Sequence, residues 1–163
     1  MNILGTQYSL KHKSLDIYLA GCAGPHCSGC HNPESWDYDN GTDYKLLIPS
    51  IIEKVKDNMV QKVFILGGEP LDQNEDELVD LLDKISGKEM WLFTRKELVE
   101  VPNKIKRFFA YIKSGRYDES LKTTSYYSYG IQLASFNQKV TKHSLQSTIK
   151  DYHYGKLFQV LSV

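Results

Sequence analysis

The chain has 163 residues, and its 20 Lys and Arg balance its 20 Asp and Glu, so the formal net charge is zero. This length suits one domain with its own hydrophobic core, and we expect a single domain over residues 1–163. The balanced charge gives no basic field for nucleic acid and no acidic field for a polycation. The sequence shows no secretory leader and no apolar run of membrane-spanning length, so we expect a cytoplasmic protein with neither nucleic acid nor membrane as partner.

The first predicted elements are a strand and a helix. Residues 14–21 alternate apolar and polar side chains, as a strand buried on one face does, and they run directly into Cys22. Residues 48–59 place apolar side chains at helical spacing, with Pro49 in the first turn of the predicted helix. The apolar stripe of this helix consists of Ile51, Ile52, Val55 and Met59.

A second strand and a second helix follow along the chain. The continuous apolar run over residues 63–66, stopped by two glycines, predicts a strand covered on both faces, which is typical of parallel sheets. Asp72 is placed to cap the next helix and Gly87 to end it. The apolar stripe of that helix consists of Leu78, Leu81, Leu82 and Ile85.

The third repeat completes an alternating pattern. Residues 89–95 predict a strand, residues 101–108 a short helix and residues 109–115 a further strand. This alternation predicts an α/β fold with a mostly parallel sheet and with ligand sites beyond the carboxyl ends of its strands. Residues 139–163 are assigned as a C-terminal extension of uncertain role, in which residues 144–163 are compatible with a helix followed by a strand.

All the cysteines of the chain lie in one short segment that has loop composition. Cys22, Cys27 and Cys30 alternate there with glycine, proline and serine, and their odd number argues against a disulfide framework. Thiolates are soft ligands that favour zinc, copper(I) or iron-sulfur clusters. His26 or His31 could complete a Cys3His zinc site, so the segment alone leaves zinc and iron-sulfur open.

A second motif lies at the end of the strand predicted around residues 63–66. Gly67 and Gly68 allow a ligand to approach the backbone closely, and Glu69 can accept hydrogen bonds from a ligand ammonium group. Pro70 then fixes the turn that leads into the next helix. Because this motif follows the three-cysteine loop, the two together are more informative than either alone.

With both motifs in place, the sequence resembles radical S-adenosylmethionine enzymes, in particular the small activases of anaerobic (class III) ribonucleotide reductase. The resemblance implies a shortened, incomplete (β/α) barrel, and a 4Fe-4S cluster held by Cys22, Cys27 and Cys30. It also implies that Gly67, Gly68, Glu69 and Pro70 bind the methionine end of S-adenosylmethionine. The matching segments are "GC" at 21–22, "CSGCHN" at 27–32 followed by "SW", "GGEP" at 67–70, "SGRYDESL" at 114–121 and "LASFNQ" at 133–138.

The resemblance implies a reaction and further site residues. Such an enzyme reductively cleaves S-adenosylmethionine to a 5'-deoxyadenosyl radical and generates a glycyl radical on the large reductase subunit, with a flavodoxin or ferredoxin-type electron donor. His31 would border the adenine, and Asn137 would lie near the cofactor, although an isolated Asn is equally often a turn residue. Thr94 and Arg95 end a predicted strand on the ligand side, where either can reach the cofactor.

Three features depart from the activase pattern. The segment before the first predicted strand lacks the Gly-Pro-Gly segment and the arginine that activases usually carry there. Four residues separate Cys22 from Cys27, where the pattern has three, and Lys113 and Ser114 stand where the family carries an acidic residue before the glycine. The alternatives are a radical S-adenosylmethionine enzyme that acts on a small molecule or peptide and, in another class, a non-catalytic Cys3His zinc module. Tyr126, Tyr127 and Tyr129 fit either a partner surface or closure of the sheet edge.

Overall fold

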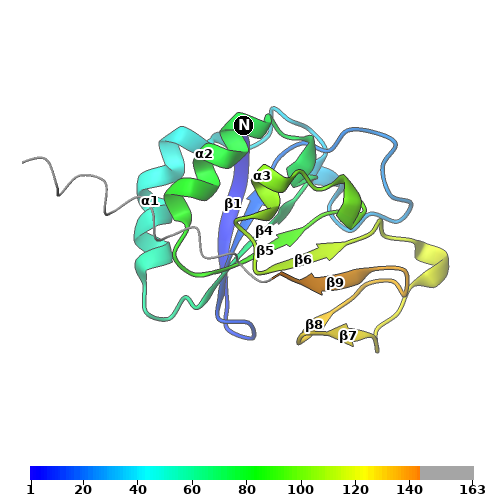
Figure 1. Cartoon of the computed structure of the whole chain (residues 1–163). Helices are drawn as coiled ribbons and strands as arrows, with labels where there is room; N and C mark the ends of the chain where they lie inside the picture. The colour runs from blue at the N-terminus through cyan, green and yellow to red at the C-terminus, as the bar shows by residue number, and fades with distance from the viewer. Residues whose placement is uncertain (144–163) are drawn as a thin grey trace, which may run out of the picture.

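A computed structural model describes residues 1–143 of the chain. One sheet has the strand order β3-β1-β2-β4-β5-β6-β9, and β7 and β8 form a separate hairpin (Figure 1). The strands are β1 (Asn2–Ser9), β2 (Ser14–Leu19), β3 (Thr42–Asp43), β4 (Lys62–Gly67), β5 (Glu89–Phe93), β6 (Tyr111–Ser114), β7 (Tyr127–Ser128), β8 (Ile131–Gln132) and β9 (Lys139–Lys142). The helices are α1 (Tyr44–Lys56), α2 (Glu75–Ile85) and α3 (Asn103–Lys106), with short 3-10 turns at Pro33–Ser35, Pro70–Asp72, Leu98–Glu100 and Glu119–Leu121.

The centre of the sheet is parallel, as the sequence predicts. β2, β4, β5 and β6 pair in parallel in the order in which they occur along the chain. β1 and β3 extend one edge and β9 the other, each by antiparallel pairing. The described sheet is therefore α/β and mostly parallel at its centre, and its edge strands β3 and β9 are not joined to each other as they would be in a closed barrel.

The two faces of the sheet carry different layers. The helices lie on one face, where their apolar side chains pack against alternate residues of the central strands, such as Val63 and Ile65 of β4 (Figure 1). On the other face Phe64 and Trp91 pack against Ile131 and Leu133, which belong to the segment around β7 and β8 (residues 123–140, the hairpin region). β4 is thus covered on both sides, which explains its unbroken apolar sequence.

The three tyrosines of the hairpin region differ in how far they are buried. Tyr126 is partly buried and packs against the second core, whereas the side chains of Tyr127 and Tyr129 are 53% and 56% exposed. The ring of Tyr129 also lies 5.1 Å from that of Tyr111 of β6. The hairpin region therefore covers the face of the sheet opposite the helices, while part of its aromatic surface stays accessible.

Two predicted helix boundaries are wrong for a clear reason. α1 begins at Tyr44, where the Asp43 carboxylate accepts a hydrogen bond from the amide of Lys45, and Pro49 therefore lies inside the helix. Met59 lies beyond the helix and its side chain is exposed. Asp72 does not cap α2, because Asn74 accepts the capping hydrogen bonds from the amides of residues 76 and 77.

The predicted C-terminal extension is described only at its start. Lys139–Lys142 forms β9 at the edge of the sheet. The helix and strand considered for residues 144–163 lie outside the described residues.

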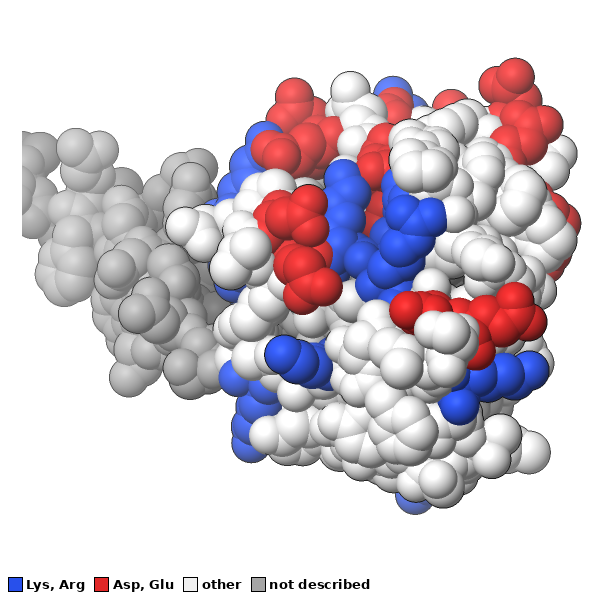
Figure 2. Space-filling view, turned by 90° about the vertical axis from the view of Figure 1, so that its right-hand side faces the viewer, with Lys and Arg blue, Asp and Glu red and all other residues white. Residues whose placement is uncertain are grey.

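Within residues 1–143, no helix combines the length and apolar character that crossing a membrane requires. On the face shown in Figure 2, Lys and Arg form a short strip flanked by Asp and Glu, in keeping with the balanced composition.

Candidate cluster and cofactor site

The cysteine loop starts at the carboxyl end of β2 and returns beside its own beginning. The amide of Gly21 donates to Ser35 O (2.8 Å), and the amide of Cys22 donates to Trp36 O (3.1 Å). The side chain of Cys22 is buried, whereas those of Cys27 and Cys30 are partly exposed. The loop therefore presents two accessible thiols and a third that lies deeper.

The two glycines after β4 allow this loop to pack directly against the next strand. The amide of Gly68 donates to Leu19 O (2.9 Å), and the amide of Glu69 donates to Gly21 O (2.8 Å). A Cβ atom at position 68 would lie 2.1 Å from Gly21 O, a distance that no side chain tolerates. Glycine is thus required here by the close approach of the cysteine loop.

Glu69 is almost completely buried behind this contact, with 1% of its surface exposed. Its Oε1 atom accepts hydrogen bonds from Thr94 Oγ1 (2.6 Å) and from the amide of Leu71 (3.0 Å), and its Oε2 atom accepts one from the amide of Arg95 (2.8 Å). Burial raises the pKa of the Glu69 carboxyl, although these hydrogen bonds oppose the shift. The carboxylate thus ties the GGEP turn to the end of β5, and its predicted contact with a ligand ammonium group stays a prediction.

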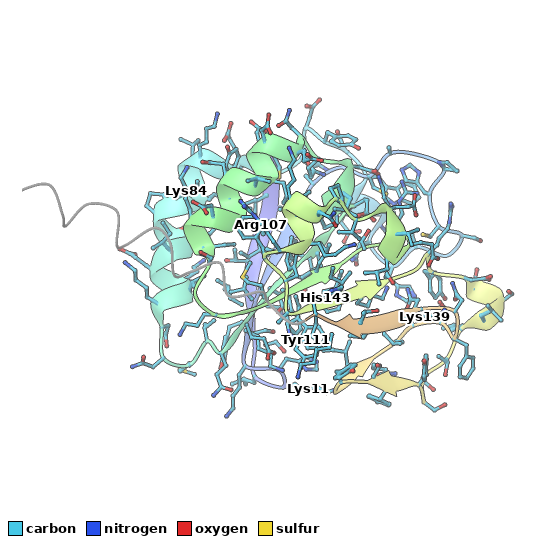
Figure 3. The ribbon with its side chains drawn as sticks, in the orientation of Figure 1. Lys11, Lys84, Arg107, Tyr111, Lys139 and His143 are labelled. Carbon is cyan, nitrogen blue, oxygen red and sulfur yellow. The ribbon has the colours of Figure 1, made fainter. Side chains whose placement is uncertain are left out.

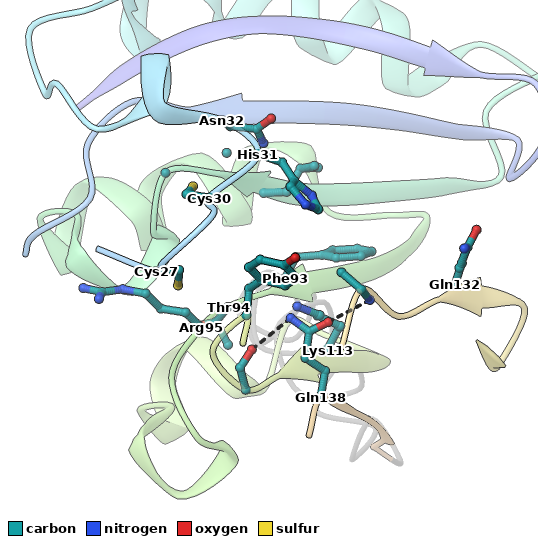
Figure 4. A pocket seen from close by; sticks show the side chains of 16 residues that line it. Cys27, Cys30, His31, Asn32, Phe93, Thr94, Arg95, Lys113, Gln132 and Gln138 are labelled. Carbon is teal, nitrogen blue, oxygen red and sulfur yellow. Dashed lines mark hydrogen bonds between the residues drawn. The ribbon is translucent and has the colours of Figure 1, made fainter. Parts of the chain in front are cut away.

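A cavity of about 310 Å³ opens between the cysteine loop and the carboxyl ends of the parallel strands. Figure 4 shows Cys27 and Cys30 on one side of this pocket and Lys113 and Gln138 on the other. The lining residues are Cys27, Cys30, His31, Asn32, Leu66, Gly67, Gly68, Phe93, Thr94, Arg95, Lys113, Gly115, Tyr117, Gln132, Ala134 and Gln138. Of the residues predicted from the sequence, the pocket brings together Cys27, Cys30, His31, Gly67, Gly68, Thr94 and Arg95.

The remaining predicted residues lie around the pocket rather than in its lining. Cys22, Glu69 and Pro70 are buried next to it, and none of the three lines it. Asn137 is exposed, and its Nδ2 atom donates to Arg116 O (2.7 Å), which is the structural role left open for an isolated Asn. The next residue, Gln138, lines the pocket instead. The Oε1 atom of its buried side chain accepts a hydrogen bond from the amide of Ala134 (3.0 Å), and its Nε2 atom donates one to Gly115 O (3.2 Å).

The two histidines of the cysteine segment have different surroundings. The ring of His26 stacks on Trp36 at 3.9 Å, and its Nε2 atom lies 2.8 Å from Cys22 O. His31 lines the pocket, where its ring contacts that of Tyr117 at 4.8 Å. His31 is thus the histidine with access to a bound group.

Lys113 gives the pocket an unpaired positive charge. Within residues 1–143 no carboxylate forms an ion pair with its ammonium group, and no Asp or Glu lines the pocket. Burial lowers the pKa of Lys113 to about 8, and the neighbouring Glu69 and Cys27 oppose the shift. The other cation of the lining, Arg95, is already engaged with Asp72 (Nη2 to Oδ2, 2.9 Å). The pocket therefore favours a ligand that carries an anionic group.

The deep thiol has a different electrostatic setting. Burial raises the pKa of the Cys22 thiol, and the positive charge of Arg95 opposes that shift. A metal ion or cluster bound at this sulfur would favour the thiolate, because metal ligation requires the deprotonated form.

The thiols of the three cysteines are chemically suited to bind a soft metal group. They come from one loop, two of them face the pocket, and the full sequence contains three cysteines. Within residues 1–143 no three His, Cys, Asp or Glu side chains converge closely enough to hold a metal ion. Three thiolates can ligate three irons of a cubane and leave the fourth iron for another donor.

Lys113, Gln138 and Tyr117 line the pocket but were not among the site residues predicted from the sequence. Lys113 could have been found, since it directly precedes Ser114 and Gly115 at the predicted carboxyl end of a parallel strand. Gln138 lies in a segment without clear periodicity, and it reaches the pocket only because β9 pairs with β6.

The fold and the site define an α/β protein with a thiol-lined pocket at the carboxyl ends of its parallel strands. The model of a family described as "4Fe-4S single cluster domain" matches residues 13–151, which is most of the chain and includes the cysteine loop, the GGEP turn and Lys113. The chain therefore belongs to the 4Fe-4S single cluster domain family. No curated protein and no solved structure matches it. Membership of this family supports a 4Fe-4S cluster rather than zinc as the group that the cysteines bind.

Proposed function

We propose that this chain is a radical S-adenosylmethionine enzyme of the glycyl radical activating type, whose target is an anaerobic ribonucleoside-triphosphate reductase. The observation that carries the proposal is one pocket lined by Cys27 and Cys30 on one side and by Gly67 and Gly68 on another. Thiols for a cluster and exposed backbone for a cofactor thus face the same space.

Cys22, Cys27 and Cys30 would hold the 4Fe-4S cluster and leave one iron open to the amino and carboxylate groups of S-adenosylmethionine. The reduced cluster would supply the electron that cleaves S-adenosylmethionine to methionine and a 5'-deoxyadenosyl radical, which takes a hydrogen atom from a glycine of the reductase.

The chain's own residues would bind and enclose the cofactor. Gly67 and Gly68 line the pocket at the end of β4 and would lie beside it, and the Lys113 ammonium pairs with its carboxylate. Leu66, Phe93 and Tyr117 provide apolar walls that suit a nucleoside and exclude water from the reacting bond.

The open sheet supports a protein as the radical's target. The sequential parallel strands with unjoined edges at β3 and β9 are compatible with an incomplete (β/α) barrel. Such an open side leaves room for an extended segment of the large reductase subunit to reach the pocket. The electron would come from a flavodoxin or a ferredoxin-type protein.

Anaerobic reconstitution with iron and sulfide tests the proposal. We expect an EPR signal of the reduced cluster that changes when S-adenosylmethionine is added, and cleavage of the cofactor to methionine and 5'-deoxyadenosine. Cys30→Ala should abolish this cleavage, whereas Ser28→Ala in the same loop should retain it.

Two further measurements separate the alternatives. Tightly bound stoichiometric zinc without a cofactor-dependent EPR change would contradict the proposal and favour the zinc module. A glycyl radical signal on mixing with the large reductase subunit supports the activase. Cofactor cleavage without that signal would favour a small-molecule or peptide substrate.

A further inference from the structure

The four residues between Cys22 and Cys27 form no regular secondary structure, yet most of their carbonyl oxygens have side-chain partners. Arg95 donates from Nη2 to Ala23 O (2.5 Å) and from Nη1 to Pro25 O (2.8 Å). Arg116 donates from Nη2 to Pro25 O (3.0 Å) and to His26 O. Two guanidinium groups thus hold the backbone of this short loop.

The guanidinium group of Arg95 is itself fixed by an ion pair. The Asp72 carboxylate pairs with Arg95 (2.9 Å) and Lys96 (2.8 Å), and it also accepts a hydrogen bond from the amide of Ala23 (2.9 Å). Although burial alone would raise it, the hydrogen bonds from Lys96 and Arg95 hold the pKa of Asp72 below its ordinary value. Asp72 therefore stays ionised and ties the loop to β5 at neutral pH.

The backbones of the two arginines are anchored by residues that the sequence singled out for another reason. Glu69 accepts a hydrogen bond from the amide of Arg95 (2.8 Å), and Asn137 donates one to the carbonyl oxygen of Arg116 (2.7 Å). These contacts place the two guanidinium groups at the carboxyl ends of β5 and β6, on the same side as the cysteine loop. The loop is thus bonded to both strands that follow β4 in the sheet.

From these contacts we infer that Arg95 and Arg116 are positioning residues for the metal-binding thiols. They hold residues 23–26 in one conformation before a metal group is bound, so that Cys22 and Cys27 are presented from fixed positions. A loop held in this way loses less conformational freedom when its thiols ligate. The inference concerns the loop itself and does not depend on which reaction the bound group serves.

The chain offers a matched control because it contains a third arginine. Arg107 is exposed, and Figure 3 places it beside α3, among the helices. No hydrogen bond joins Arg107 to the cysteine loop in the described part of the chain. Arg107→Gln therefore removes the same charge as Arg95→Gln or Arg116→Gln without touching the loop.

Hydrogen exchange of the metal-free protein, followed by NMR or mass spectrometry, is the primary test. In Arg95→Gln and Arg116→Gln we expect the loop amides of Cys22, Ala23 and Cys30 to exchange about tenfold faster, because hydrogen bonds to charged groups are lost. Buried strand amides, such as those of Ile65 and Leu92, should keep their rates. Unchanged loop rates would overturn the inference, as would an equal rise across the sheet or the same effect in Arg107→Gln.

Substitution by lysine separates positioning from charge alone. Arg116 donates to both carbonyl oxygens through one nitrogen, which a lysine ammonium can imitate, so Arg116→Lys should restore slow exchange. Arg95 uses two nitrogens for Ala23, Pro25 and Asp72, so Arg95→Lys should not. Equal rescue by both lysine variants would contradict the geometric role.

Retention of the bound group provides a second measurement. After anaerobic reconstitution with iron and sulfide, Arg116→Gln should lose iron to a chelator about tenfold faster than the unmodified chain or Arg107→Gln, because its thiols are less well ordered. Equal rates of iron loss in all three proteins would overturn the inference even if cofactor cleavage is observed.

Discussion

Lys113 shows how a single side chain can set the charge of a whole pocket. Its ammonium group has no carboxylate partner in the described part of the chain, and it faces a lining that contains no Asp or Glu. Glu69, the nearest acid named by the sequence, is buried and bonded to Thr94, Leu71 and Arg95. The residue that pairs with a ligand's anionic group is therefore expected to be Lys113.

Replacement of Lys113 by Met should weaken the binding of S-adenosylmethionine to the reconstituted protein by about tenfold or more, because a charge-assisted hydrogen bond is lost. Binding of decarboxylated S-adenosylmethionine, which lacks the carboxylate, should hardly change. Isothermal titration calorimetry with both ligands measures the difference. Equal weakening of both would show that Lys113 acts through packing.

The same lysine predicts a dependence on pH. Since burial lowers the pKa of Lys113 to about 8, the unbound pocket loses its positive charge as the pH rises through that value. The cofactor's amino group must lose its own proton to ligate iron, so the effect of Lys113 is measured as the ratio of the affinities of the unmodified chain and Lys113→Arg, in which the guanidinium group stays charged. This ratio should be constant well below pH 8 and fall above it by up to about tenfold per pH unit; a constant ratio across that range would contradict the role of Lys113.

Individual site residues could be predicted where sequence spacing carries the information. Gly67 and Gly68 were singled out because glycine lets a ligand approach the backbone, which stays a prediction; the structure gives a different reason for both, since a Cβ atom at either position would meet the backbone of Leu19 or Gly21. Gln138 could not be predicted, because its position depends on the antiparallel pairing of two strands. Local sequence does not encode such pairing between distant segments.

At the scale of elements, the site is a junction between one loop and the ends of three parallel strands. The loop after β2 lies against the end of β4 through Gly68, and it is bonded to residues that follow β5 and β6. Displacement of any one of these strand ends would alter the position of the thiols.

Gly68→Ala tests this junction. The added Cβ atom would meet Gly21 O at 2.1 Å and Ser35 O at 2.8 Å, so the backbone must shift. We expect the free energy of unfolding to fall by about 1–3 kcal/mol and the iron content after reconstitution to fall with it. Urea denaturation and iron analysis measure the two effects. Gly5→Ala, where no atom lies within 4 Å of the new Cβ, is the control, and equal losses in both variants would contradict the explanation.

The elements divide clearly into those that could be predicted and those that could not. The central strands and α2 carry strong periodic patterns, and Leu78, Leu81, Leu82 and Ile85 are all buried as expected. β3 and β9 were not predicted, because edge strands are stabilised by pairing rather than by a continuous apolar sequence. β1 was not predicted either, because Ile3 is its one buried residue and its sequence carries no clear alternation. The start of α1 was misplaced because Pro49 marked a boundary that the Asp43 cap overrides.

For the molecule as a whole, stability depends on two separate apolar layers. The helices cover one face of the sheet, and the hairpin region (residues 123–140) covers the other face, where it buries Ile131 and Leu133. The strand alternation predicted the first layer. A cover on the second face was also predicted, from the unbroken apolar run of β4, but the segment that supplies it was not, because residues 123–140 have no regular period.

Leu133→Ala measures the contribution of this second layer. Leu133 is fully buried against the sheet, so its truncation should lower the free energy of unfolding by about 2–5 kcal/mol. Leu10→Ala, at a side chain that is 78% exposed, should change it by less than about 0.5 kcal/mol. Urea denaturation followed by circular dichroism compares them. Similar small losses in both would show that the hairpin layer contributes little.

The hydrogen bond from Arg116 to Pro25 joins residues that are 91 positions apart in the chain. During synthesis the three cysteines leave the ribosome long before the two arginines that hold their loop have been made. The thiols are thus exposed on an unfinished polypeptide, free to take up stray metal ions or to oxidise. The loop can therefore reach its described conformation only after the chain has been made as far as Arg116.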